Sequence, residues 1–372
     1  MRVTRLTLHN FRNYADLSIQ PDSGLNVLVG KNAQGKSSVL EGIYVAATTR
    51  SWRAGKDSEL IRWDAEQARI TLDVAREAQN DIEIEVTLGR TDKKRVSINT
   101  VHQTRLSDVI GQAKVLLIEP EDGEIVRGEP SIRRRFLNLE ISQIQPMYCH
   151  LLVSYRKVLE QRNRLLKDMH RVRSRGGVLD AWNEQLVSYG SRILERRLAF
   201  VSHIARVAEV IHSQITDDAE ALEIEYASKT NLEGVSTAAE AADRLRQRME
   251  EARDEEIQRG ITLIGPQRDD LLVRVNGMDA RVYGSHGQQR TIALSLRLAE
   301  LEVMEEIAKE PPIVLLDDVM TDLDDERRAH VFAMTRDRCQ TFLTAASERF
   351  LQAEVLAGAK VFKVSDGGVT PA

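Results

Sequence analysis

The first hundred residues show the spacing of apolar and polar positions that is typical of β-strands. Residues 81–88 alternate strictly, with aliphatic residues on one face and mainly glutamates on the other, as in a half-exposed antiparallel strand. Shorter apolar-rich runs bounded by turn residues predict further strands at residues 2–8, 17–19, 25–29 and 95–98. We therefore expect a layer of antiparallel β-structure in this part of the chain.

In the middle of the chain, apolar residues recur at the spacing of helices. Leu152, Tyr155 and Leu159 lie three or four positions apart, and a similar pattern resumes after the glycine pair at 176–177. Two amphipathic stretches joined by a glycine turn predict an antiparallel helical hairpin over residues 147–215.

The last third of the chain mixes both patterns. Residues 271–275 predict a strand, and a helix is expected from about Gln288. Residues 313–316 and 340–343 are continuous apolar runs, the pattern of parallel strands buried on both faces. The whole pattern predicts an α/β fold interrupted by a helical region.

The composition of the 372-residue chain is that of an ordinary globular protein. Hydrophobic residues make up 42% and charged residues 29%, which excludes a disordered chain. No run approaches the ~18 apolar residues of a membrane span, and no signal-peptide core follows the N-terminus, so we expect a cytoplasmic protein without membrane contact. Cys149 and Cys339 lie far apart, which argues against a disulfide framework and a C-x-x-C zinc site.

Residues 30–37 carry the most specific chemical signal. They fit the pattern G-x-x-x-x-G-K-[ST] and lie between an apolar strand and an apolar helical run. In such a loop, backbone N–H groups and the helix N-terminus hold phosphates. The expected ATP-binding residues are Gly30, Lys31, Asn32, Ala33, Gln34, Gly35, Lys36 and Ser37, with Lys36 on the β- and γ-phosphates and Ser37 on Mg²⁺. A plain glycine-rich turn is the alternative, which the flanking strand and helix disfavour.

Two acids follow the apolar run at 313–316. A P-loop needs carboxylates at the end of a neighbouring strand, so Asp317 is expected to hold Mg²⁺ through water and Asp318 to polarise the attacking water. Aspartate also commonly begins turns, so the pair carries this interpretation only beside the P-loop.

A second candidate anion site lies at residues 283–290, before another apolar helix. Ser285 fits an N-cap and Gly287 permits close approach of an anion, with Gln288 beside it. The segment resembles the signature motif of ABC-type ATPases, in which the signature of one subunit closes over the γ-phosphate held by its partner. A plain capped helix is the alternative reading.

Together these segments resemble the RecF family of bacterial recombination mediators over nearly the whole chain. The Gly-Pro-x-Arg-Asp-Asp run at 265–270 and the Gly-Gln-Gln signature are more specific to that family than to ABC ATPases at large. The matching stretches are residues 8–14, 30–37, 56–61, 130–137, 264–270, 285–290 and 315–318.

The resemblance implies an ABC-type P-loop ATPase head with an antiparallel β sub-layer and a helical second lobe that carries the hairpin. Residues 1–110 and 261–372 would form the ATPase lobe, and residues 111–260 the helical lobe. It also implies an ATP-dependent homodimer, Mg²⁺, DNA binding and slow, switch-like ATP hydrolysis. Cooperation with RecO and RecR in loading RecA at single-strand gaps, replication and SOS induction are implied as well.

Several positions depart from the ABC pattern. Asp318 stands where a glutamate usually follows the first acid, and the shorter side chain suits slow hydrolysis. Residues 343–346 lack the expected histidine, and residues 118–121 lack the glutamine of the Q-loop. The γ-phosphate sensor and the Q-loop therefore stay unassigned, whereas residues 321–324 fit the D-loop.

The net charge of −5 argues at first against a nucleic-acid partner, but the charge is unevenly distributed. Residues 156–175 carry eight lysines and arginines against two acids, without an interleaved aromatic platform. Such a face would neutralise phosphates regardless of sequence, and a solvated helix face is an equal alternative. The candidate DNA contacts are Arg156, Lys157, Arg162, Arg164, Lys167, Arg171 and Arg173.

Three functions compete for these motifs. The first is an ATP-gated DNA clamp of the RecF kind. A metabolic P-loop enzyme, such as a nucleotide kinase, needs a substrate lid and leaves residues 285–289 unexplained. A chromosome-structural protein of the SMC class needs coiled coils of hundreds of residues, whereas this hairpin spans about 70. The first function accounts for most of the motifs.

Overall fold

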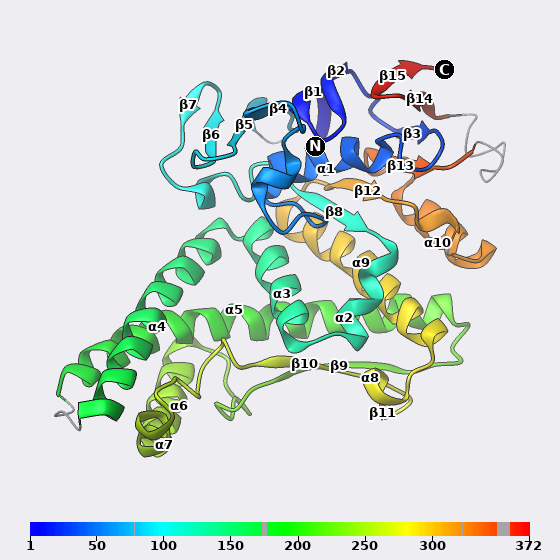
Figure 1. Ribbon diagram of the computed structural model, residues 1–372. Helices are drawn as coiled ribbons and strands as arrows, with labels where there is room; N and C mark the ends of the chain where they lie inside the picture. The colour runs from blue at the N-terminus through cyan, green and yellow to red at the C-terminus, as the bar shows by residue number, and fades with distance from the viewer. Residues whose placement is uncertain (78, 173–176, 322, 348–357) are drawn as a thin grey trace. The chain divides into compact units, whose positions relative to one another are not determined.

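The computed structural model describes all of the chain except residue 78, residues 173–176, residue 322 and residues 348–357 (Figure 1). The chain divides into two units. The first combines Met1–Asp122 with Ala293–Ala372, and the second is Gly123–Ile292. The chain therefore leaves the first unit once and returns to it.

One sheet of the first unit is the antiparallel layer that the alternating pattern predicts. Its strands, in spatial order, are β2 (Tyr14–Ile19), β1 (Arg2–Phe11), β4 (Gln67–Ala75), β5 (Ile82–Gly89), β6 (Arg95–Ile98) and β7 (Val101–His102). In β5, fully buried residues alternate with partly exposed ones, so one face packs on the core and the other is half open.

The second sheet of this unit is mainly parallel. Its strands, in spatial order, are β15 (Gly368–Pro371), β14 (Lys360–Ser365), β3 (Leu25–Val29), β13 (Thr341–Ala345), β12 (Ile313–Leu316) and β8 (Val115–Ile118). Strands β8, β12 and β13 are buried at every position, as their continuous apolar runs require. Because β12, β13 and β3 run parallel, their carboxyl ends meet at one edge of the sheet.

Helix α1 (Lys36–Thr48) contacts strands of both sheets, which explains why it is buried on nearly every side. Gly42 permits close packing, since a Cβ there would lie 2.7 Å from the side chain of Leu8. The buried Glu41 is neutralised by Arg12, which donates from Nε and Nη2 to the two carboxylate oxygens at 2.7 Å each. The other helical elements described in the unit are η1 (Asp57–Leu60), η2 (Leu106–Asp108), η4 (Val319–Thr321) and α10 (Asp325–Thr335). The short helix η3 (Pro120–Gly123) lies where the first segment of the unit ends, at Asp122.

The second unit contains the predicted helical hairpin. Helices α4 (Pro146–Val172) and α5 (Gly177–Ile215) pack along each other, and α5 also packs on α6 (Ala238–Glu251) and β9 (Leu222–Ala227). The remaining elements are α2 (Glu124–Arg127), α3 (Pro130–Ile144), α7 (Arg253–Arg259), β10 (Asp270–Val275), β11 (Met278–Asp279) and α8 (Ala280–Tyr283). Helix α9 (His286–Ala308) begins in this unit and ends in the first.

The Gly-Pro-x-Arg-Asp-Asp segment lies in a buried polar network of the second unit. Arg197 donates to the carbonyl of Pro266 at 2.7 Å and to the hydroxyl of Tyr226 at 3.0 Å. Tyr226 in turn donates to Asp269 Oδ2 at 2.7 Å. Burial raises the pKa of Asp269, and this hydrogen bond opposes the rise. The segment therefore joins α5 to the β9–β10 sheet.

The two units divide later in the sequence than the expected boundaries at residues 110 and 260. Strand β8 pairs in parallel with β12, so the chain up to Asp122 belongs to the first unit. Strand β10 pairs with β9 from Asp270 to Val275, so these residues group with the helices, and the second unit continues to Ile292. Both strand pairs join residues that lie far apart in the chain, so the local hydrophobic pattern of either partner could not predict them.

Candidate nucleotide-binding site

The loop between β3 and α1 is built around two glycines. Gly35 has φ of 109°, and a Cβ there would lie 2.4 Å from the side chain of Asn13, so only glycine fits. A Cβ on Gly30 would lie 2.2 Å from the carbonyl oxygen of Val364. Tight packing at both ends therefore fixes the loop as a preformed turn before the N-terminus of a helix, the geometry that binds phosphate.

Lys36 lies across this loop. Its Nζ donates to the carbonyl oxygens of Gly30 at 2.7 Å and Lys31 at 3.0 Å. Desolvation lowers the pKa of Lys36, while the nearby Asp318 and Asp317 act to raise it. A triphosphate would offer this ammonium stronger acceptors than the neutral carbonyls it now contacts.

The two acids at the end of β12 are joined by a residue that the sequence reasoning left unassigned. Thr344 Oγ1 donates to Asp317 Oδ1 at 2.9 Å and accepts from the backbone N–H of Asp318 at 2.8 Å. Asp318 has a left-handed backbone with φ of 54°, a strained geometry that is concentrated at functional sites. Thr344 lies within the segment that lacks the expected histidine, and it holds the carboxylate of Asp317 and the backbone of Asp318.

A cavity of about 460 Å³ brings these groups together. Lys36, Ser37 and Asp318 line it, and Asp317, which is 8% exposed, reaches its wall through Thr344. This volume suits a small-molecule ligand. The lining residues that the sequence reasoning missed are Arg12, Asn13, Ser38, Arg53, Glu59, Ile61, Trp63 and Thr344.

The turn between β1 and β2 supports the loop from one side. Asn13 Nδ2 donates to the carbonyl of Gln34 at 2.9 Å, and the Tyr14 hydroxyl donates to the carbonyl of Gly35 at 3.1 Å. These two bonds hold the loop through its carbonyl groups and use none of its N–H groups. The resemblance of residues 8–14 to the RecF family was the signal that could have identified this support.

The second candidate anion site is an open helix N-terminus. Ser285 Oγ accepts from the N–H of Gln288 at 3.2 Å, and Gln288 Oε1 accepts from the N–H of Ser285 at 2.9 Å, so the two residues cap α9 reciprocally. Ser285, His286 and Gly287 are exposed, and a Cβ on Gly287 would approach only Ser285 Oγ, at 3.8 Å. An anion can reach this positive helix end without obstruction from the side chain of residue 287.

Four of the candidate DNA contacts form an exposed basic face on α4. They are Arg156, Lys157, Arg164 and Lys167. The side chain of Arg171 and the whole of Arg173 lie outside the described residues. The basic face as a DNA contact stays a prediction.

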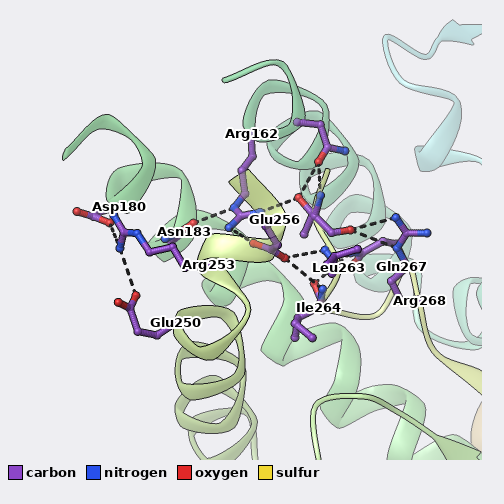
Figure 2. A network of polar contacts seen from close by, with 12 residues as sticks. Arg162, Asp180, Asn183, Glu250, Arg253, Glu256, Leu263, Ile264, Gln267 and Arg268 are labelled. Carbon is purple, nitrogen blue, oxygen red and sulfur yellow. Dashed lines mark hydrogen bonds and ion pairs between the residues drawn. The ribbon is translucent and has the colours of Figure 1, made fainter. Parts of the chain in front are cut away.

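Arg162 is not part of this basic face (Figure 2). Its side chain is 1% exposed, and its Nη2 donates to Glu256 Oε2 at 2.6 Å. Its Nε and Nη1 donate to Asn183 and Thr262, both at 2.8 Å. The prediction that Arg162 contacts DNA is wrong, because a buried ion pair uses its donors.

Glu256→Ala is expected to lower the free energy of unfolding of the second unit by about 3–5 kcal/mol, because it leaves Arg162 buried without a counter-charge. The control is Glu160→Ala, which removes the partner of Arg156, a side chain 77% exposed. That exposed pair is worth about 0.5 kcal/mol or less. Urea unfolding followed by circular dichroism measures both losses, and losses of equal size would contradict this account of the buried pair.

Two further features are absent from the described residues. Among their helices, none combines the length and the apolar character needed to cross a bilayer. They contain no group of three His, Cys, Asp or Glu residues that could hold a metal ion unaided. Ser37 and Asp317 still fit Mg²⁺, which is commonly bound by one or two protein oxygens together with phosphate oxygens and water.

Comparison with known proteins gives a consistent result over the full length. A family model described as RecF/RecN/SMC N terminal domain matches residues 2–369. A protein of Lysinibacillus sphaericus (strain C3-41), named DNA replication and repair protein RecF, is 40% identical over 370 residues, which are 99% of both chains. The protein of the same name from Bacillus subtilis (strain 168) is 38% identical over 99% of this chain and 100% of its own.

Solved structures confirm the predicted fold. The recombination mediator protein RecF bound to ATP, described as part of the RecFOR pathway, matches with a TM-score of 0.92 at 32% identity, over 100% of this chain and 97% of that one. An Smc head bound to the C-winged helix domain of ScpA matches with a TM-score of 0.55 at 15% identity, which supports the likeness of fold alone. The expected ATPase-head architecture is therefore correct.

Proposed function

Because the chain belongs to the RecF family, we propose that it is an ATP-dependent DNA-binding protein of replication and recombinational repair. In this proposal ATP and Mg²⁺ bind at the P-loop, and two chains then form a homodimer that binds DNA at single-strand gaps. The dimer helps RecO and RecR to load RecA recombinase and is needed for SOS induction. Slow hydrolysis of ATP to ADP and phosphate releases the dimer.

The observation that carries the proposal is the cavity that joins Lys36, Ser37 and Asp318. Lys36 would neutralise the β- and γ-phosphates, and Ser37 and Asp317 would hold Mg²⁺, which supplies charge neutralisation of the phosphates when bound. A metabolic kinase would use the same loop, but the relatives that match over the full length are named repair proteins.

The open cap at Ser285 supports the shared-site part of the proposal. A second anion-binding helix end has no role in a site that a single P-loop completes. In the proposed dimer, the N-terminus of α9 from one chain approaches the γ-phosphate bound by the other. Two nucleotides would then lie between two heads, and dimerisation would follow ATP.

DNA binding that depends on ATP tests the function. We expect fluorescence anisotropy of a labelled gapped duplex to report tight binding with ATP and Mg²⁺ and much weaker binding with ADP or without nucleotide. Replacing Arg156, Lys157, Arg164 and Lys167 with alanine should weaken binding to all sequences alike and reduce the salt slope by up to about 4. A DNA affinity that is the same with ATP, with ADP and without nucleotide would contradict the proposal, and so would an affinity that depends on the DNA sequence.

Asp318→Asn is expected to keep ATP and Mg²⁺ bound and to slow hydrolysis by about a hundredfold or more, because the amide cannot polarise the attacking water as a carboxylate does. The ATP-bound dimer should consequently live longer. Stopped-flow dissociation and phosphate release measure the two effects. A shorter dimer lifetime together with weaker ATP binding would instead make Asp318 a metal ligand.

A further inference from the structure

Trp63 is an exposed tryptophan at the edge of the phosphate-binding cavity. Its side chain is 96% exposed, more than any other large apolar residue in the described part of the chain, and it lines the cavity that contains Lys36 and Ser37. A tryptophan side chain that becomes buried removes roughly 150–250 Å² of surface from water, so it contributes much of the energy of the contact that buries it. A ring left bare beside a ligand cavity is therefore a candidate binding surface.

The backbone around Trp63 is held in place although its ring is bare. The guanidinium of Arg90 donates from Nη2 to the carbonyls of Arg62 at 3.0 Å and Trp63 at 2.9 Å, and from Nε to the carbonyl of Ala65 at 2.8 Å. The N–H of Arg62 donates to the carbonyl of Asn10 at 2.9 Å. One arginine thus holds three backbone carbonyls within residues 62–65 and fixes the backbone that carries the exposed ring.

The cavity needs a second surface besides the phosphate loop. A nucleoside triphosphate carries a flat, apolar base at the end opposite its γ-phosphate, and the loop residues serve only the phosphates. Bases stack on aromatic side chains, which contributes about 1–3 kcal/mol per base. Resting on the nucleotide site proposed above, we propose that Trp63 stacks on the base of the nucleotide whose phosphates the P-loop holds.

Stacking on Trp63 would favour any nucleotide that carries a base, without distinguishing one base from another. Every base presents a π-face, so stacking alone accepts adenine and guanine alike. The contribution of Trp63 should therefore be the same for ATP and GTP. It should be zero for inorganic tripolyphosphate, which has the same phosphates and no base.

Titration calorimetry with ATP, GTP and tripolyphosphate tests the assignment on the full chain. Trp63→Ala should weaken ATP and GTP binding by about tenfold and leave tripolyphosphate binding unchanged. Trp63→Phe keeps a ring and should retain most of the affinity. Since the replaced side chain is exposed, neither variant should disturb folding. Val101→Ala, at another exposed apolar residue of this unit, controls for loss of surface apolar area and should change nothing.

Arg90→Ala tests whether this arginine positions the ring. This variant should weaken the binding of ATP but not that of tripolyphosphate. In a Trp63→Ala background it should have no further effect on ATP affinity. If Arg90 merely stabilised the fold, its loss would weaken the binding of both ligands and would do so independently of Trp63.

Three results would overturn the inference. The first is ATP affinity unchanged by Trp63→Ala, and the second is an equal loss for tripolyphosphate. The third is unchanged ATP binding by the monomer with loss of dimerisation only, which would make Trp63 a contact between chains. Failure of the phosphate site itself is seen separately, as wild-type protein that does not bind tripolyphosphate, and it would overturn both proposals.

Discussion

Ser285→Arg is expected to abolish ATP-dependent dimerisation while leaving ATP binding by the monomer unchanged. Ser285 lies at an exposed helix N-terminus in the second unit, whereas the P-loop belongs to the first. The new side chain would place a bulky cation where the γ-phosphate of the partner must approach. DNA affinity should fall with dimerisation, because the proposed DNA surface is complete only when two heads meet. Sedimentation velocity with and without ATP, beside a nucleotide titration, measures both properties.

Ser285→Ala is the matched control for this effect. It removes the same cap hydrogen bond to Gln288, at a cost of about 1 kcal/mol of helix stability, without adding bulk. Dimerisation should therefore survive in this variant at lower affinity. If Ser285→Arg formed an undiminished ATP-dependent dimer, the shared-site mechanism would be excluded. Residues 285–290 would then be an ordinary helix cap without a role in nucleotide binding.

Lys36→Met is expected to weaken ATP binding by about a hundredfold and to remove hydrolysis. Lys36 provides the only ammonium among the described residues that line the cavity, and charge-assisted bonds to phosphate are worth about 1.5–3 kcal/mol each. Lys36→Arg should also remove hydrolysis, because its broader fork cannot lie between the phosphates in the same way. Calorimetry with ATP and a phosphate-release assay measure the two losses.

The control for this prediction is Lys93→Met, since Lys93 is exposed and does not line the cavity. Wild-type hydrolysis by the purified Lys36 variants would refute the assignment of Lys36. A mixture of Lys36→Met and Ser285→Arg chains offers a further check, because each heterodimer would hold one intact shared site. Such a mixture should recover at most half of the wild-type ATPase activity.

The sequence predicts those parts of the fold that depend on local spacing. The strict alternation before Gly89 and the apolar run Ile313–Leu316 each describe one strand and its burial, and both are correct. The unit boundaries depend instead on β8 pairing with β12 and β9 with β10, which join residues far apart in the chain. No local pattern contains that information.

The same distinction separates the parts of the site that the sequence predicts from those it misses. The loop at 30–37 is contiguous, so its motif is complete in the sequence. Thr344 acts on Asp317 only because β13 lies beside β12 in the folded sheet. Arg162 looked like its exposed neighbours on α4, since its partner Glu256 lies 94 residues away and determines its burial.

The most direct test of the central claim is the mass of the wild-type chain in solution, measured by analytical ultracentrifugation without nucleotide, with ADP, and with ATP and Mg²⁺. We expect a monomer in the first two conditions and a dimer in the third, because only the γ-phosphate can join the P-loop of one chain to the α9 N-terminus of the other. A monomer in all three conditions, or an equal fraction of dimer in all three, would contradict the ATP-dependent dimer.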